Sequence, residues 1–384
     1  MFHGVMARKP KAPVQAAQIR GLKYLRAFWD VLEPLRQMPA HGNRRFLMDQ
    51  YVSLLLLHFF NPTLDSLRAL QQATGLGNVQ KVLGVGRTSL GAMSESAGYV
   101  FDPALLEPII QEVAGQIETL PKDQRLEALP GVLTAVDGSF LRCLPRMTWA
   151  LFRHKTTNRA VRMHLHFDVQ RGIPAELDIT DARCSEKKVL RRRIRPGILY
   201  VIDRGFIDYR LYQDIHDGKS FFVARLKDNS TYQVLRENPL SPQDRQAGVV
   251  CDQWVRMGSA FTEGLLTAPV RRLVIRDEKG KEIILLTNTD LPAEIIGLIY
   301  RYRWQVELFF RWFKCILKCT HWLSTTQTGL TLQVYVAVLA SLLISLWTGR
   351  KPTKRTFEMI CLYFQGWAKP EELAAHIESL KNRS

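Results

Sequence analysis

The chain has 384 residues, of which 46% are hydrophobic and 23% are charged. These ordinary proportions exclude a chain too polar to fold, and the length allows two or three domains with a sizeable core. The charge balance is unusual, because 53 Lys and Arg residues against 36 Asp and Glu residues give a formal net charge of +17. Such an excess predicts attraction to a polyanion, either nucleic acid or an anionic membrane surface.

Residues 1–125 are expected to form a helical domain. Apolar residues recur at helical spacing in 22–36 and in 43–60, and a third helix begins near Thr63 or Asp65 as the candidate cap. Another helix is expected in "DPALLEPIIQEVAGQI". Short helices with basic residues suit a domain that binds DNA ends, and a plain helical docking domain is an equally good interpretation.

At Gly131 the pattern changes to short strands. "GVLTAVDGSFLRCL", "RAVRMHLHFDVQRG" and "IPAELDITDA" predict three strands separated by turns. "SEKKVLRRRI" predicts a short helix capped by Ser185, and "GILYVIDRGF" predicts a buried strand. A helix in "DYRLYQDIHDG" and a strand in "SFFVARLKDN" complete the segment. Residues 126–229 therefore predict an α/β unit, a mixed sheet with crossover helices.

The rest of the chain alternates between strands and helices on a larger scale. Residues 230–289 predict a mainly β insertion, with strands in "VVCDQWVRMG", "VRRLVIRD" and "KEIILLTNT". Helices resume over 290–348, and 349–384 predict a helical C-terminal tail. The stretch 330–349 carries no charge and is almost long enough to span a bilayer, but its Thr, Gln and Ser residues favour a helix buried in the domain.

The cysteines and the N-terminal segment indicate a cytoplasmic protein. Six cysteines form no CxxC pair, which favours reduced thiols. Cys315, Cys319 and His321 lack a second pair of ligands, so a zinc site there is disfavoured. The first residues contain no apolar segment of the kind found in a signal peptide.

Three carboxylates are distinguished by their surroundings. Asp137 is expected at the end of the first strand and Asp203 at the end of the strand "LYVID", so both should reach the rim of the sheet. The segment "IYRYRWQVELFFRWFK", residues 299–314, predicts a single amphipathic helix that carries Glu307 on its polar stripe. The stripe also includes Tyr300, Arg303 and Lys314, and Arg311 and Lys318 extend it.

The opposite side of this helix is expected to be core. It carries the apolar residues Val306, Leu308, Phe309, Phe310, Phe313 and Leu317, together with the Trp residues of the segment. The helix can thus pack on a sheet while directing Glu307 to its rim. A solvated salt-bridge ladder is the alternative, but it stabilises a helix by only about 0.3–0.5 kcal/mol per pair and does not explain Tyr300.

Three carboxylates at one rim fit a site for divalent metal. Asp137, Asp203 and Glu307 could hold two Mg²⁺ ions about 4 Å apart, which would activate a water or a 3′-hydroxyl and stabilise the leaving oxygen. The neighbouring Arg and Lys residues are suited to bind phosphate.

The spacing of the stripe matches a known family. Tyr300, Arg303, Glu307 and Lys314 have the spacing Y-(2)-R-(3)-E-(6)-K, and the chain resembles the DDE transposases of the insertion sequence 4 family, which share this signature. "TAVDGSF" and "VIDRGF" resemble the strands that carry the family's first and second aspartates. "FVARLKDN" and "LLTNT" resemble further family segments, so the resemblance covers about residues 130–345.

The resemblance implies an RNase H-like catalytic core interrupted by the β insertion. It implies that Asp137, Asp203 and Glu307 bind two Mg²⁺ ions, for which Mn²⁺ can substitute. It also implies cut-and-paste transposition, in which water nicks double-stranded DNA at terminal inverted repeats and the freed 3′-hydroxyl later attacks target DNA. Tyr300, Arg303 and Lys314 would hold the phosphates, and a homodimer would pair the two ends.

One position departs from the family. A Trp that stacks on a flipped base precedes the strand that "EIILLTN" resembles, and this chain has Glu282 and Ile283 there. Trp254, earlier in the insertion, is the remaining candidate for base stacking. A hairpin intermediate is therefore not implied for this chain.

Further basic residues are candidates for DNA contact. Arg204, Arg225 and Lys227 are expected near the rim of the sheet, whereas the run "KKVLRRRIR" fits DNA contact and a solvated helix face equally well. His164 and His166 share one face of a strand, and with no third ligand we expect core histidines there.

The alternatives to a transposase are a nuclease without strand transfer and a catalytically inactive DNA-binding protein. A membrane protein is the least favoured of the four functions.

Overall fold

The computed structural model describes residues 31–38, 42–119, 123–150, 159–259, 262, 264–277, 279–317 and 321–381. The expectations for residues 22–30, Lys318 and Cys319 lie outside this part of the chain, as do the side chains of Cys315 and Leu317. Two compact units are present, one formed by residues 1–96 and 343–384 and the other by residues 97–342. The domain boundaries expected from the sequence stay a prediction.

The first unit is helical. Its helices are α2 (Glu33–Arg36), α3 (Met48–Phe60), α4 (Leu67–Ala73), α5 (Gly77–Leu83), α6 (Leu90–Glu95), the last residues of α13 (Gln327–Thr348), α14 (Lys354–Phe364) and α15 (Pro370–Lys381). Phe60 at the end of α3 is fully buried and its ring stacks on Phe364 at 5.6 Å. The cap of α4 is Ser66, whose side chain accepts from the backbone of Ala69, and neither Thr63 nor Asp65 takes that place.

The second unit is built on one mixed sheet of nine strands in the described residues, in the order β3-β2-β1-β4-β5-β9-β8-β7-β6. Its strands are β1 (Val132–Arg142), β2 (Ala160–Asp168), β3 (Ile173–Asp181), β4 (Ile198–Ile202), β5 (Phe221–Arg225), β6 (Tyr232–Glu237), β7 (Val249–Met257), β8 (Val270–Arg276) and β9 (Glu282–Thr287). β1, β4 and β5 run parallel, and every other neighbouring pair is antiparallel.

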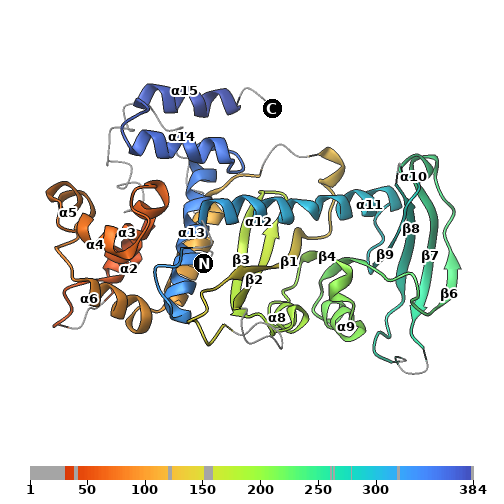
Figure 1. The fold of residues 1–384 in the computed structure, drawn as a ribbon. Coiled ribbons are helices and arrows are strands. Elements are labelled where there is room, and N and C mark those ends of the chain that lie inside the picture. The colour runs from red at the N-terminus through yellow and green to blue at the C-terminus, as the bar shows by residue number, and fades with distance from the viewer. Residues whose placement is uncertain are drawn as a thin grey trace, which may run out of the picture. The chain divides into compact units, whose positions relative to one another are not determined.

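Helices cover both faces of this sheet (Figure 1). α8 (Glu186–Arg192) and α9 (Tyr209–Asp217) pack on one face against β1 and β5, while α11 (Ala293–Tyr302) and α12 (Trp304–Leu317) run across the other. This unit also contains α7 (Glu107–Gln116), α10 (Pro242–Gln246) and the greater part of α13. The order of strands and helices in 131–229 is the one that the sequence predicts, since β4 and β5 are short apolar runs and turn residues separate the strands.

The core on the α8–α9 side joins the sheet to these helices. Ile202, Leu211, Ile215 and Phe222 are all fully buried there, and the ring of Tyr212 stacks on Phe222 at 4.7 Å. Burial of this kind stabilises by roughly 1.5–3 kcal/mol per large apolar side chain. The sheet is therefore a rigid platform for side chains that project from its strands.

Residues 230–289, predicted as a β insertion and called the insertion here, extend the sheet formed by β1 to β5. β9 pairs antiparallel with β5, so β6 to β9 continue the same sheet to its edge. The sequence predicts β7, β8 and β9 but not β6 or α10. β6 is the edge strand and most of its residues are exposed, so it has no buried face to leave an alternating pattern.

α13 contains the charge-free stretch. It is long and apolar enough to cross a membrane by length and composition, and 89% of its most apolar window is buried inside the structure. That burial agrees with the core helix expected from its polar residues.

Candidate active site

Asp137 and Asp203 lie on adjacent parallel strands. Ala135 of β1 pairs with Val201 of β4, and continuing this register by two residues places Asp137 level with Asp203. The register begins at Val132, and a Cβ on the preceding Gly131 would lie 2.4 Å from the carbonyl oxygen of Gly197. The bare glycine thus allows the two strands to start side by side and brings the two acids to the same height.

Asp137 is not at the end of its strand, in contrast to the sequence prediction. β1 continues to Arg142, and Gly138 pairs with His164 of β2 rather than forming a turn. Asp203 does follow the last residue of β4, as predicted. The Asp-Gly dipeptide predicts a turn because a glycine after an acid is common in turns. Here the glycine lies inside the strand, and its missing side chain leaves room for a neighbouring residue.

Gly138 makes room for a fourth carboxylate that the sequence did not reveal. A Cβ at Gly138 would lie 2.2 Å from Glu186 Oε1. Glu186, the first residue of α8, pairs with Arg162 of β2 at 3.3 Å. No sequence periodicity links Gly138 to Glu186. The one sequence feature that could have indicated the close approach of another group is a glycine inside a continuing strand.

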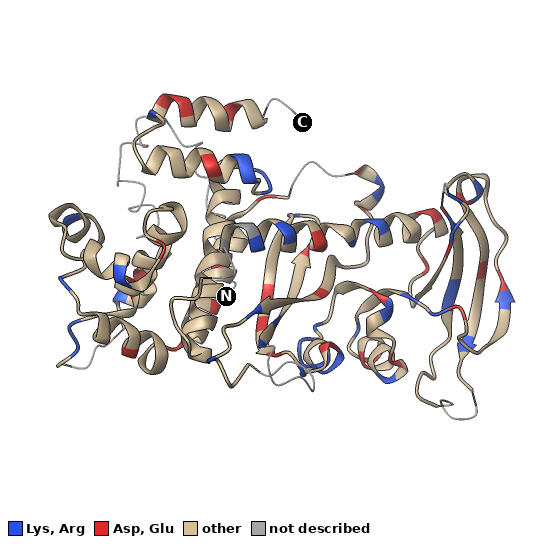
Figure 2. Ribbon diagram, viewed as in Figure 1, with Lys and Arg blue, Asp and Glu red and all other residues tan. Residues whose placement is uncertain are grey.

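Glu307 lies on the second of two consecutive helices, whereas the sequence predicts a single helix over 299–314. α11 ends at Tyr302 and α12 begins at Trp304, with Arg303 between them. The backbone of Arg303 is still helical, but the local bonds from Arg303 N to Tyr300 O and from Val306 N to Arg303 O tighten to a three-residue spacing. Figure 2 shows a single acidic band on α12 with basic bands to either side.

The signature side chains contact all three acids. The Tyr300 hydroxyl donates to Asp203 Oδ1 at 3.1 Å. Arg303 donates through Nη2 to Glu307 Oε1, and its Nη1 lies 3.6 Å from Asp137 Oδ2. The structure therefore brings Asp137, Asp203 and Glu307 into one network through Tyr300 and Arg303.

Burial sets the electrostatics of Asp137. Desolvation raises the pKa of Asp137 to about 6, partly opposed by the Gly138 backbone N–H, which donates to Oδ1 at 2.8 Å, and by the Arg303 guanidinium. The charges of Glu186 and Glu307 raise it further. Burial also raises the pKa of Tyr300 to about 12, and the neighbouring Asp203 adds to the shift, so its hydroxyl remains a donor.

These shifts predict that Asp137→Asn stabilises the metal-free protein near neutral pH. The pKa of Asp137 rises on folding from its ordinary 3.8 to about 6, so the native state binds the proton more tightly and the free energy of unfolding falls as pH rises through this window. The variant should be more stable by about 1–3 kcal/mol at pH 7.5, with the difference lost below about pH 4. Calorimetry at both pH values without divalent metal measures it; a less stable variant at pH 7.5 would show that the Arg303 attraction outweighs burial.

The donor chemistry suits a hard divalent cation. In the described residues, no three His, Cys, Asp or Glu side chains are grouped closely enough to hold a metal ion. Carboxylate oxygens are nevertheless the ligands that Mg²⁺ prefers, and Asp137, Asp203 and Glu307 supply them from two strands and a helix. Their residue types therefore fit the ion, and Arg303 contacts two of the three.

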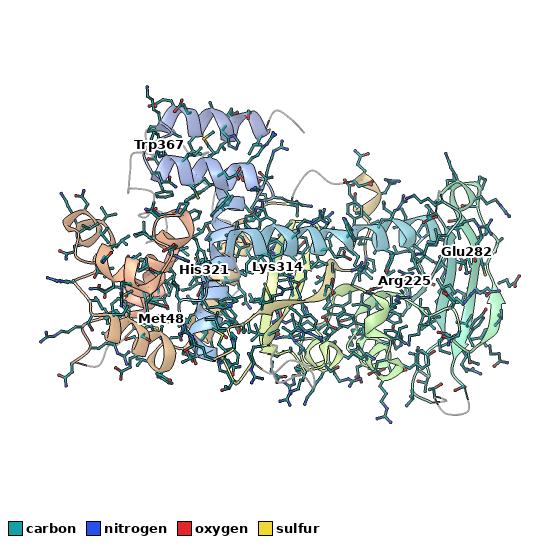
Figure 3. All side chains as sticks on the ribbon, in the orientation of Figure 1. Met48, Arg225, Glu282, Lys314, His321 and Trp367 are labelled. Carbon is teal, nitrogen blue, oxygen red and sulfur yellow. The ribbon has the colours of Figure 1, made fainter. Side chains whose placement is uncertain are left out.

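The predicted phosphate-binding residues differ in their exposure. Arg204, Lys227 and Arg311 are exposed, whereas Arg225 and Lys314 are half-buried. Arg225 lies close enough to Tyr300 for its charge to act on the pKa of that hydroxyl. Arg225 is the last residue of β5 and Lys314 lies on α12, and Figure 3 labels both side chains.

Trp254 lies in the insertion. It is half-buried on β7, in register with Arg236 of β6 and Arg271 of β8, and the Arg236 guanidinium is 6.0 Å from its ring centroid. Glu282, which stands near the family's Trp position, pairs with Arg276 at 2.8 Å. Figure 3 shows Glu282 on the part of the sheet formed by β6 to β9, away from Lys314.

Three sequence expectations need correction or restriction. Leu308 and Trp304 are 45% and 50% exposed, so they are not part of the α12 core, which contains Val306, Phe309, Phe310 and Phe313. Both residues lie beside the polar stripe and face solvent. The sequence prediction divided the helix into one polar and one apolar side, and so it assigned them to the core. Ser185 precedes α8 but makes no capping hydrogen bond through its side chain.

Most of the basic run at 187–195 is paired within the chain. Lys187 donates to Ile207 O at 2.6 Å, and Arg191 contacts Asp214 at 2.5 Å. Arg193 contacts Asp178 at 2.8 Å and Arg195 contacts Glu176 at 2.9 Å. This pairing favours a structural role for these four residues over DNA contact. His164 and His166 are buried, and burial lowers the pKa of each to about 4, as expected for core histidines.

Comparison with known proteins identifies the family. The sequence model of the transposase DDE domain family matches residues 129–343, a segment that contains all three acids. The chain belongs to the transposase DDE domain family. A protein of Sinorhizobium fredii named as a transposase is 34% identical over 189 residues, which are 48% of this chain and 53% of that protein.

Two further relatives place this match in context. A protein of Geobacillus stearothermophilus named as a transposase for insertion sequence element IS5377 is 26% identical over 213 residues, 55% of each chain. The chain thus spans about half the length of these curated relatives. A piggyBac transposase in a synaptic complex with hairpin DNA has a TM-score of 0.42 and 11% identity over 94% of this chain and 78% of that one, a similarity too low to define a shared fold.

Proposed function

We propose that the chain is a DNA transposase that moves an insertion sequence by cutting and joining DNA at its terminal inverted repeats. The observation that carries this proposal is the network of Asp137, Asp203 and Glu307 through Tyr300 and Arg303. Family membership supports it, as does the excess of Lys and Arg. We further propose that the protein acts in the cytoplasm of a prokaryotic cell, associated with the nucleoid when bound to DNA.

The catalytic core is proposed to be RNase H-like. The mixed order of β1 to β5, with acids on two adjacent parallel strands and a third acid on a helix across them, supports this assignment. β6 to β9 then correspond to the β insertion. The helical part before residue 126 is proposed to bind the DNA ends.

Asp137, Asp203 and Glu307 would hold two Mg²⁺ ions, or Mn²⁺ in their place, and bound metal would supply a lower pKa for the attacking water and neutralise charge on the reacting phosphate. Water forms a bond to phosphorus and the 3′ oxygen leaves as a hydroxyl. That hydroxyl then attacks a target phosphodiester, and the target's own 3′ oxygen leaves. Tyr300, Arg303 and Lys314 position the phosphates, with Arg204, Arg225, Lys227 and Arg311 as further contacts.

The assembly is proposed to be a homodimer on paired ends, as the family resemblance implies. Trp254 stays a candidate for base stacking. A nuclease that cuts without joining is the second candidate function, because the same three acids serve hydrolysis alone. A DNA-binding protein without catalysis has no use for Tyr300 and Arg303 contacts to three half-buried acids.

A cleavage assay separates these candidates. We expect the full-length protein with Mg²⁺ or Mn²⁺ to nick labelled duplex DNA that carries the inverted repeats flanking its gene, and not a scrambled duplex. Equal cleavage of both duplexes favours a general nuclease. Binding of the repeats without cleavage in either metal favours the inactive binding protein.

A further inference from the structure

Arg303 occupies the space between two of the three acids. One end of its guanidinium donates to Glu307 and the other lies 3.6 Å from Asp137. The Arg303 side chain is only 12% exposed, and its charge lies 5.8 Å from the centre of the Tyr300 ring. In this conformation it is the counter-ion of Asp137 and Glu307.

The hydrogen bonding of this counter-ion is incomplete. Arg303 Nε is buried and has no hydrogen-bond partner in the described part of the chain. The contact with Asp137 at 3.6 Å is an ion pair rather than a hydrogen bond. A guanidinium has five N–H donors in a planar fork that matches phosphate. A phosphate can therefore accept more hydrogen bonds from Arg303 than these two acids do.

We propose that Arg303 holds the acids of the DNA-free protein in a conformation that keeps divalent metal out, and that DNA phosphate draws it away. This inference rests on the proposed function. The guanidinium uses an oxygen of Glu307 and its positive charge repels a second cation close to Asp137. Metal binding and the Arg303 contacts are therefore mutually exclusive at these two acids.

The exchange couples metal to DNA. When Arg303 moves to a phosphate, Asp137 and Glu307 lose their counter-ion and attract a divalent cation in its place. By thermodynamic linkage, bound metal must then favour DNA binding by the same factor. Arg303 acts here as a positioning residue, and the arrangement restricts metal-dependent hydrolysis to a site that already holds DNA.

The test measures Mn²⁺ binding to the DNA-free protein by isothermal titration calorimetry at constant ionic strength. The variants are Arg303→Gln, which removes the bridge and the charge, and Arg303→Lys, whose single ammonium cannot bridge both acids. The matched control is Arg301→Gln, which removes an equal charge from an exposed position two residues away, in the last turn of α11. Circular dichroism verifies that each variant is folded.

We expect Arg303→Gln to bind Mn²⁺ at least about tenfold more tightly than the wild type, and Arg303→Lys to lie between them. Arg301→Gln should stay within about twofold of the wild type. If Arg303→Gln does not fold, Arg303→Lys decides. Wild-type affinity in both Arg303 variants overturns the proposal, and so does an equal gain in Arg301→Gln.

The coupling has its own measurement. The affinity for a labelled duplex is determined by fluorescence anisotropy with and without Mn²⁺ at constant ionic strength. Mn²⁺ should favour duplex binding at least about fivefold more in the wild type and in Arg301→Gln than in Arg303→Gln. Equal metal effects in all three overturn the coupling. Absence of duplex binding contradicts the proposed function, while the titration without DNA still decides whether Arg303 excludes metal.

Discussion

Asp203→Asn should abolish both DNA cleavage and strand joining. The amide keeps the size of the side chain and can still accept the Tyr300 hydroxyl bond of 3.1 Å, so the fold should be undisturbed. It removes a negative charge that the proposed metals require. Metal catalysis supplies several kcal/mol of charge stabilisation, and each 1.36 kcal/mol is a factor of ten, so we expect a loss of at least about a thousandfold.

A single-turnover assay on a pre-nicked and an intact duplex measures both steps of this prediction. The matched control is Asp217→Asn, which changes an exposed acid of α9 that accepts a bond from Gln213. α9 packs on the face of the sheet opposite to α11 and α12 (Figure 1). The control should cleave and join normally. Substantial cleavage by Asp203→Asn would remove Asp203 from the proposed metal site.

Arg271→Met should destabilise the insertion by about 3–5 kcal/mol. Arg271 donates to Asp252 through Nε at 2.8 Å and Nη2 at 2.5 Å, and through Nη1 to Leu291 O. Arg271 and Asp252 are only 8% and 5% exposed, so removing the guanidinium leaves a buried carboxylate with Asn238 as its remaining side-chain donor in the described residues. A buried charge without its partner accounts for the cost.

Hydrogen exchange of the β7 and β8 amides measures this loss locally. The control is Arg276→Met on the same strand, because Arg276 and Glu282 are about half exposed and such a pair contributes at most about 1 kcal/mol. Replacing both partners by Arg271→Met with Asp252→Leu should recover much of the stability. A loss in Arg271→Met no larger than in Arg276→Met would contradict the structural role of the buried pair.

The sequence predicts the platform of the site well because its signals are local. Strands β1, β4 and β5 are apolar runs bounded by turns, and Asp203 follows one of them directly. The spacing of Tyr300, Arg303 and Glu307 carries over to the structure, because backbone torsions stay helical through Arg303 although the regular hydrogen bonds are interrupted there. Only the register of β1 with β4 then remains to bring the acids together.

What the sequence does not show depends on contacts between distant residues. Glu186 approaches Asp137 only because Gly138 lacks a side chain, and no spacing relates the two. Trp304 and Leu308 are exposed because the sheet covers only part of the α12 circumference. The pairing of Arg193 and Arg195 with acids of β3 likewise requires the folded sheet, since a run of basic residues has the same pattern whether it contacts DNA or acids.

Sequencing of strand-transfer products tests the central claim most directly. The full-length protein is incubated with Mg²⁺, a linear DNA that ends in the inverted repeats flanking its gene, and a supercoiled target plasmid. We predict junctions in which the 3′ ends of the repeats are joined to target DNA, with staggered joining sites on the two target strands, and none with Asp203→Asn. Cleavage of the repeats by the wild-type protein with no joined junctions would contradict a transposase and identify the chain as a nuclease.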